Sequence, residues 1–270
     1  MKIYEYKKEI DDAKKIINSI KTLKYDSISI YGSAYNDKTF VDGFSDIDMI
    51  IMCANFNELN LDNIVKEIRS KNINFREKEP TIIRDNLCER IEFYIQFERV
   101  SLDITICGGL IPSKKELLKS AWYDSFEALI GGVYIYSKTI YGKIPDYDLF
   151  KKEYYPFYND EIRNARLQII CKKLKSYNKK IEYNYNEKNY EAIDNVIKAR
   201  KFFIKLLFIY YKKYYWTPEK HVYYQLDNYL NLDKEFKEKL SFAKGNMFKC
   251  INDYLQISNS FIEKIEKELK

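Results

Sequence analysis

Residues 45–51 read SDIDMII, and this short stretch decides how the whole chain is interpreted. Side chains alternate between the two faces of a β-strand, so Asp46 and Asp48 share one face and the apolar residues around them share the other. Two adjacent carboxylates repel each other unless a cation lies between them, and a hard divalent ion such as Mg²⁺ prefers oxygen ligands. The stretch therefore predicts a strand with one buried face and an acidic, metal-binding pair on the other.

A glycine-serine pair precedes this stretch at the end of another predicted strand. Residues 27–31 (SISIY) alternate as a strand does and lead into Gly32 and Ser33. Gly32 has no β-carbon and allows a close approach to the backbone, while Ser33 adds a hydroxyl donor. The pair can hold the terminal phosphates of a nucleotide next to the acidic strand.

A third carboxylate is predicted from a hairpin further along the chain. Residues 91–97 and 100–106 both alternate strictly and are joined by a short polar link. A turn at that link puts Asp103 nearly opposite Tyr94 and on the same face as Glu92. Asp103 is then the best candidate for a ligand of a second metal ion, and Glu92 is a candidate additional base. An ordinary charge on a solvated strand face is the alternative for both.

The remaining sequence is mainly helical in pattern. An amphipathic helix near residues 5–23 and a shorter one at 62–71 flank the predicted strands. From about residue 146, long segments have helical periodicity. We expect an α+β chain with a mixed β-sheet flanked by helices in residues 1–145 and an all-α helical bundle in residues 146–270.

Composition narrows the function classes. The 270 residues include no run of eighteen uncharged apolar residues and no signal-peptide pattern, which predicts a cytoplasmic protein without a membrane span. Five scattered cysteines and one histidine, His221, disfavour a disulfide framework and a structural zinc site. Residues 151–270 hold 25 Lys and Arg against 16 Asp and Glu, a net charge of +9, whereas residues 1–150 have a net charge of −3. The basic half can attract phosphates, although a lysine-rich helical face is often only solvated.

These motifs together resemble a known superfamily. The pair Gly32-Ser33, the Asp-x-Asp of residues 46–48 and the single Asp103 resemble the nucleotidyltransferase superfamily, of which DNA polymerase beta is the type member. The resemblance covers roughly residues 25–107. A looser resemblance, carried by YWTPEK at 215–220 in an all-helical half, is to the helical domain of bacterial antibiotic and aminoglycoside adenylyltransferases.

The resemblance implies a Mg²⁺-dependent transfer of a nucleoside monophosphate, with ATP as the favoured donor, to a hydroxyl of a small molecule such as an aminoglycoside or other antibiotic. Pyrophosphate would be released. The implied metal ligands, for two Mg²⁺ ions, are Asp46, Asp48 and Asp103. The implied nucleotide contacts are Gly32, Ser33, Ser45 and Lys220.

Other interpretations stay open at this point. Asp46 can instead cap a turn, Asp48 can pair with Arg84 or Arg90, and Lys220 can be a plain surface lysine. The acceptor can be RNA or protein, which the basic half favours, but no RNA-binding motif is visible. A nucleotide-binding regulatory module without catalysis is a further alternative. The sequence does not predict the oligomeric state.

Overall fold

The structure is a computed structural model that describes residues 2–35, 39–42, 44–75, 78–84, 89–111, 114–119, 126–216, 222–241 and 247–270. The chain divides into two compact units, one made of Met1–Ile111 and Leu129–Lys152 and the other of Pro112–Ala128 and Glu153–Lys270. The first unit therefore extends past the expected boundary at residue 145, and the second takes in an earlier segment of the chain.

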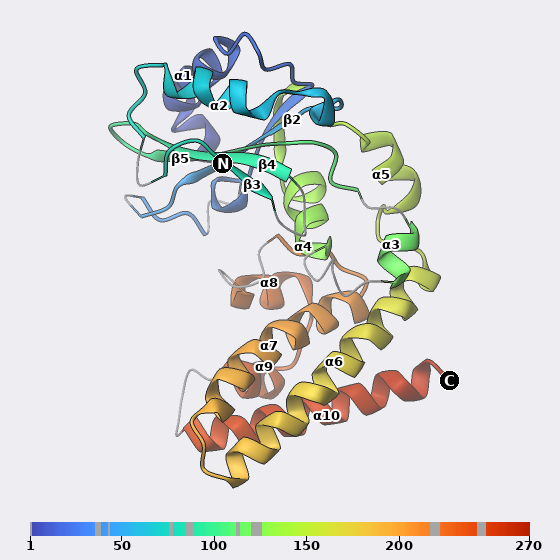
Figure 1. Cartoon of the computed structure of the whole chain (residues 1–270). Helices are drawn as coiled ribbons and strands as arrows, with labels where there is room; N and C mark the ends of the chain where they lie inside the picture. The colour runs from blue at the N-terminus through green and yellow to red at the C-terminus, as the bar shows by residue number, and fades with distance from the viewer. Residues whose placement is uncertain are drawn as a thin grey trace. The chain divides into compact units, whose positions relative to one another are not determined.

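A six-stranded mixed sheet forms the centre of the first unit (Figure 1). The strand order is β3-β4-β5-β2-β1-β6. Only the β2 and β5 pair is parallel, while the other neighbours are antiparallel. The strands are β1 (Ser27–Tyr31), β2 (Ile47–Met52), β3 (Thr81–Arg84), β4 (Glu89–Gln96), β5 (Ser101–Cys107) and β6 (Lys138–Gly142).

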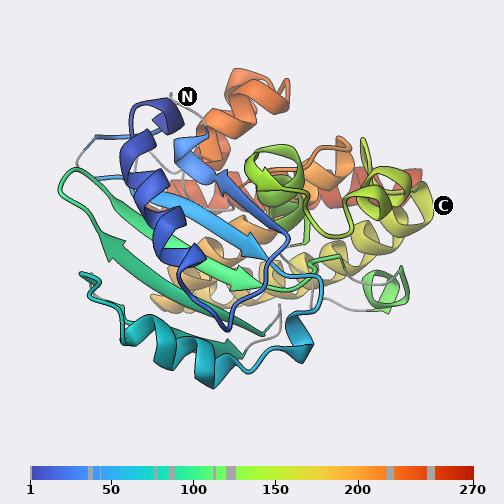
Figure 2. The same ribbon diagram turned by 90° about the horizontal axis from the view of Figure 1, so that it is seen from above.

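The two helices α1 (Lys7–Asn18) and α2 (Leu61–Arg69) cover one face of this sheet (Figures 1 and 2). Their apolar sides join the strands in one buried core, to which β2 contributes Ile47, Met49 and Ile51. Alternation along the strand leaves Asp48 on the opposite face. This confirms the predicted mixed sheet flanked by helices.

The strand registers agree with the expected hairpin. Phe97 donates its backbone N–H to Val100 O at 3.0 Å, which closes the turn between β4 and β5. Tyr94 then pairs with Asp103 across the two antiparallel strands, as the sequence predicted.

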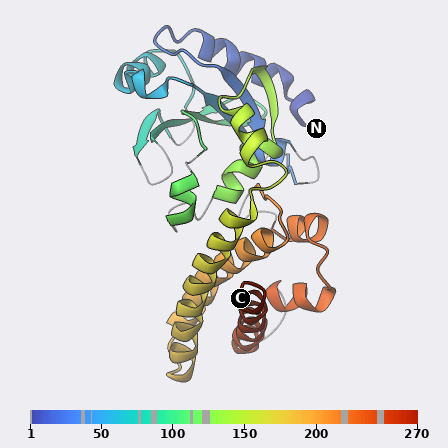
Figure 3. The same ribbon diagram turned by 90° about the vertical axis from the view of Figure 1, so that its right-hand side faces the viewer.

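The second unit is helical. Helices α6 (Asp160–Asn186) and α7 (Glu191–Tyr210) lie side by side, and α10 (Met247–Glu268) packs against both (Figures 1 and 3). The shorter helices are α3 (Lys114–Lys119), α4 (Phe126–Ile130), α5 (Tyr147–Glu153), α8 (Val222–Tyr229) and α9 (Lys234–Ser241), some of which belong in part to the first unit. Within the described ranges, no helix combines the length and the apolar character needed to cross a membrane.

Two adjacent glycines lie inside a helical segment. Helix α4 leads into Gly131 and Gly132, and the chain continues through both as a π-helix, Gly131–Ile135 (η5). Both glycines are buried there, and η5 packs against β1. Close packing of the glycine backbone thus outweighs its weak helix propensity.

Candidate metal centre

Three carboxylates meet at one end of the central strands. Parallel pairing of β2 with β5 places Asp48 directly beside Asp103, and Asp46 precedes β2 by one residue. One oxygen from each of Asp46, Asp48 and Asp103 lies within 4.8 Å of the other two. Ligand oxygens lie about 2.1 Å from Mg²⁺, and paired catalytic ions lie about 3.5–4 Å apart, so this spacing suits one or two divalent ions.

The environment of Asp103 favours a bound cation. Its Oδ1 is buried and has no hydrogen-bond partner in the described part of the chain. Burial raises the pKa of Asp103 to about 6, and the charges of Asp46 and Glu92 add to this rise, while hydrogen bonding from Tyr94 and the charge of Lys78 oppose it. A buried oxygen without a partner is costly, and a metal ion is the kind of ligand that would satisfy it.

Gly32 makes the room that Asp48 occupies. Its φ of +68° lies in the left-handed region, which glycine adopts without strain. A β-carbon at this position would lie only 2.0 Å from Oδ2 of Asp48. Ser33 follows in the short 3₁₀ helix Gly32–Ala34 (η2), is buried, and lies where this helix packs against β2. The structure therefore brings the glycine-serine corner and the acidic pair together.

Ser45 has a contact that the sequence did not indicate. Its hydroxyl accepts a hydrogen bond of 3.0 Å from the backbone N–H of Val41. Its own backbone N–H donates to Val41 O at 2.8 Å. Ser45 thus fastens the loop that leads into Asp46, and the observed contact supports a structural role.

Glu92 lies on the same sheet face as Asp103 but is engaged by two cations. It forms ion pairs with Lys78 and with Arg90. Burial raises the pKa of Glu92, but the hydrogen bonds and charges of these two cations outweigh burial and hold the pKa below its usual range. A carboxylate held in this way is a weak proton acceptor, so the contacts favour a role in fixing Lys78 and Arg90.

The sequence left open that Asp48 pairs with Arg84 or Arg90 instead of binding a metal ion. Arg90 pairs with Glu92, and Arg84 pairs with Glu89. Lys220 and His221 lie outside the described residues.

Two residues beside the acidic group were missed at the sequence level. Tyr94 hydrogen-bonds Asp103, and Lys78 contributes a positive charge to its surroundings. Tyr94 could have been found, because the hairpin pattern already placed it opposite Asp103. Lys78 could not, because it precedes β3 in a segment without a regular pattern.

We expect the Asp103→Asn variant to be more stable than the unsubstituted protein in the absence of metal at pH 8. The folded-state pKa of about 6 lies above the usual value of 3.8 for an aspartate, so the folded protein holds this proton more tightly and loses stability as pH rises from about 4 to 6. The difference corresponds to about 3 kcal/mol. Urea unfolding in EDTA should therefore show a gain of about 2–3 kcal/mol at pH 8 and little change at pH 4. A loss of stability at pH 8 would contradict the buried charge.

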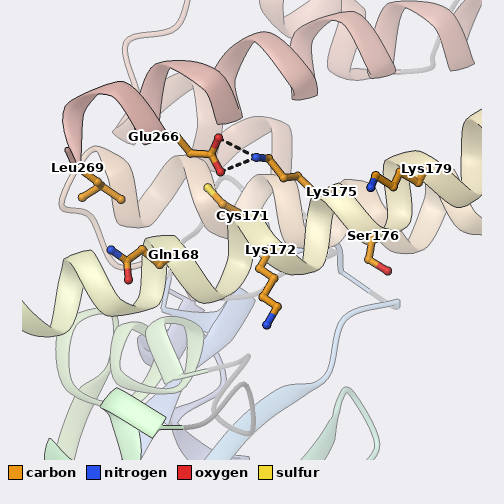
Figure 4. Close-up of a pocket in the computed structure, with 8 residues that line it drawn as sticks. All are labelled: Gln168, Cys171, Lys172, Lys175, Ser176, Lys179, Glu266 and Leu269. Carbon is orange, nitrogen blue, oxygen red and sulfur yellow. Dashed lines mark hydrogen bonds and ion pairs between the residues drawn. The ribbon is translucent and has the colours of Figure 1, made fainter.

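Two cavities lie in the helical unit. A cavity of about 510 Å³ is lined by Lys172, Lys175 and Lys179 of α6 and by Glu266 of α10 (Figure 4). Lys175 pairs with Glu266 at 2.6 Å, whereas Lys172 and Lys179 make no ion pair with a described residue. A second cavity of about 520 Å³ lies around Tyr185, Tyr190 and Ile251.

Comparisons with known proteins give little further information. No protein-family model matches the chain, and no curated protein matches it in sequence. The chain is similar to the crystal structure of a nucleotidyltransferase-like protein from Exiguobacterium sibiricum, with a TM-score of 0.41 and 11% sequence identity over 93% of this chain and 72% of that one. A likeness at this level establishes neither a family nor an activity, so function has to be inferred from the chain's own residues.

Proposed function

We propose that this chain is a metal-dependent nucleotidyltransferase that moves a nucleoside monophosphate from a nucleoside triphosphate to a hydroxyl of a small molecule. The observation that carries the proposal is the meeting of Asp46, Asp48 and Asp103 within 4.8 Å beside Gly32. We favour Mg²⁺ as the metal, because all three ligands are carboxylates. We favour ATP as the donor because of the resemblance to adenylyltransferases in residues 215–220.

The residues present fit a divalent ion on two grounds. Oδ1 of Asp103 is buried without a hydrogen-bond partner among the described residues, and the space next to Oδ2 of Asp48 exists only because residue 32 lacks a β-carbon. Asp46 and Asp48 would hold one ion, and Asp103 would join them in holding a second. When bound, the ions neutralise phosphate charge and lower the pKa of the acceptor hydroxyl.

The chain's own residues would mainly position the reactants. Gly32 allows the triphosphate to approach the backbone, and Ser33 offers a hydroxyl donor. The acceptor oxygen bonds to the α-phosphorus, the bond from this phosphorus to the bridging oxygen breaks, and pyrophosphate leaves with that oxygen while the hydroxyl proton passes to water. Positioning and charge neutralisation carry most of such a reaction.

The acceptor is proposed at the level of a hydroxylated small molecule, with antibiotics as the first class to test. Residues 151–270 have a net charge of +9. A polycationic aminoglycoside would be repelled by that charge, which favours an uncharged or anionic acceptor, although carboxylates of the acidic first half could still attract it.

The test combines donor and acceptor in one assay. Purified protein is incubated with Mg²⁺, each of the four triphosphates and a panel of hydroxylated antibiotics, including aminoglycosides, and pyrophosphate release is measured together with acceptor mass. We expect release that needs both Mg²⁺ and an acceptor, with an acceptor mass increased by one nucleoside monophosphate. Release that persists in EDTA, or no release with any pair, would contradict the proposal.

A macromolecular acceptor is the second candidate, and the lysines of α6 favour it. Lys172, Lys175 and Lys179 recur at helical spacing along one exposed side of α6 (Figure 4). A polyanion that binds there releases counterions, so its affinity must fall as salt rises.

If the lysines bind a polyanion, a Lys172→Glu/Lys179→Glu variant should elute from heparin at clearly lower salt than the unsubstituted protein. The matched control is Lys198→Glu/Lys234→Glu, which makes the same charge change at exposed lysines on α7 and α9. Equal elution of the two variants would show that only net charge matters and would leave the small-molecule acceptor favoured.

A further inference from the structure

Tyr94 is a neutral polar side chain that contacts the acidic group directly. It lies opposite Asp103 in the register of β4 with β5, and its phenol donates a hydrogen bond to the Asp103 carboxylate. Adjacent strands hold the two residues at fixed positions, so this contact is set by the sheet itself rather than by a loop.

The contact uses one side of the carboxylate and leaves the other side free. Oδ1 of Asp103 is buried and has no hydrogen-bond partner among the described residues. Asp46 lies close enough to both Tyr94 and Asp103 for its charge to act on them. The Asp103 carboxylate is thus held by one hydrogen bond, one of its oxygens has no partner among the described residues, and the carboxylate belongs to the acidic group.

The nearby cations are placed differently. Lys78 and Arg90 both form ion pairs with Glu92 on the same sheet face. A lysine or arginine bound to Asp103 would compete with a metal ion for the negative charge, because it would neutralise the carboxylate. A phenol can orient the carboxylate without adding positive charge.

We propose that Tyr94 is a positioning residue that fixes the Asp103 carboxylate so that its free oxygen binds a divalent metal ion. The proposal rests on the metal site of the proposed function and adds to it a residue outside the predicted set of ligands. Partners that orient a ligand in this way change metal affinity by about 10–100-fold.

The test is a Mn²⁺ titration of the full chain. Electron paramagnetic resonance measures the free Mn²⁺ at each point of the titration. Tyr94→Phe keeps the ring and removes only the hydroxyl. We expect it to weaken Mn²⁺ binding about 10-fold. The matched control is Tyr25→Phe, which removes a phenol hydroxyl that donates a hydrogen bond to Asn18 in the same unit. This variant should bind Mn²⁺ as the unsubstituted protein does.

A double-mutant cycle separates positioning from a general loss of stability. If Tyr94 acts through Asp103, Tyr94→Phe should have no further effect on Mn²⁺ binding in an Asp103→Asn background. Thermal unfolding in EDTA shows whether each variant is folded at the titration temperature.

The outcomes distinguish this proposal from the metal site. Unchanged Mn²⁺ affinity in Tyr94→Phe, with weakened affinity in Asp103→Asn, would overturn the role of Tyr94 and leave the metal site intact. An equal effect of Tyr94→Phe in both backgrounds would also overturn it. If the unsubstituted protein binds no Mn²⁺, both the metal site and the role of Tyr94 are refuted.

Discussion

The Asp48→Asn variant is expected to release pyrophosphate at least about 1,000-fold more slowly than the unsubstituted protein, while keeping its fold. Asp48 lies between the glycine-serine corner and Asp103, since it pairs with Tyr31 on one side and with Asp103 on the other. Asparagine keeps the shape of the side chain but removes the negative charge that attracts a divalent ion. The loss is measured by stopping the reaction at fixed times, with saturating triphosphate, and quantifying the pyrophosphate released.

The matched control for this variant is Asp62→Asn, which removes an exposed carboxylate in the first turn of α2. It should retain nearly full activity, because its charge is on the solvated side of the helix. Activity that survives in Asp48→Asn or in Asp46→Ala would refute the assignment of these residues as metal ligands.

The Gly32→Ala variant is expected to lose both metal binding and stability. A β-carbon at residue 32 would lie 2.0 Å from Oδ2 of Asp48, so the carboxylate would have to move. A displacement of this size can cost roughly 100-fold in rate. The positive φ of +68° adds about 1–2 kcal/mol of strain for any residue with a β-carbon. Mn²⁺ affinity and urea unfolding measure the two effects separately.

Gly142→Ala provides the control for backbone strain and a steric clash away from the acidic group. Gly142 has a φ of +65°, and its added β-carbon would meet the backbone of Asp26 rather than a carboxylate of the acidic group. We expect Gly142→Ala to lower stability but, while folded, to bind Mn²⁺ as the unsubstituted protein does. If Gly32→Ala also kept its Mn²⁺ affinity, the glycine would not be needed for the metal site.

The centre of the sheet could be predicted because its sequence pattern is local and strong. Alternation along β4 and β5 sets the direction of each side chain, and the short link between these two strands sets their register. These two facts were enough to place Asp103 opposite Tyr94. The parallel pairing that brings Asp48 next to Asp103 is a long-range contact that no local pattern specifies.

The sheet edges could not be predicted in the same way. Both β3 and β6 are short and lie at the two ends of the strand order. An edge strand has one neighbour and partly exposed side chains, so its residues need not alternate between apolar and polar.

Side-chain partners outside regular elements were also beyond the sequence. Glu92 was predicted on the correct sheet face, but its two cations come from β4 itself and from Lys78 in an irregular segment. Ser45 was expected at the nucleotide because of its place in the motif, whereas its hydroxyl accepts from Val41. Such contacts depend on the folded path of the loops, which turn chemistry alone does not fix.

The most direct test of the three-carboxylate site is anomalous diffraction from crystals of the protein grown with Mn²⁺ and a non-hydrolysable triphosphate. The predicted result is a Mn²⁺ peak within about 2.2 Å of an oxygen of both Asp46 and Asp48, with Asp103 at the same peak or at a second one about 3.5–4 Å away. Mn²⁺ bound elsewhere, with the three carboxylates paired to protein cations instead, would contradict the account.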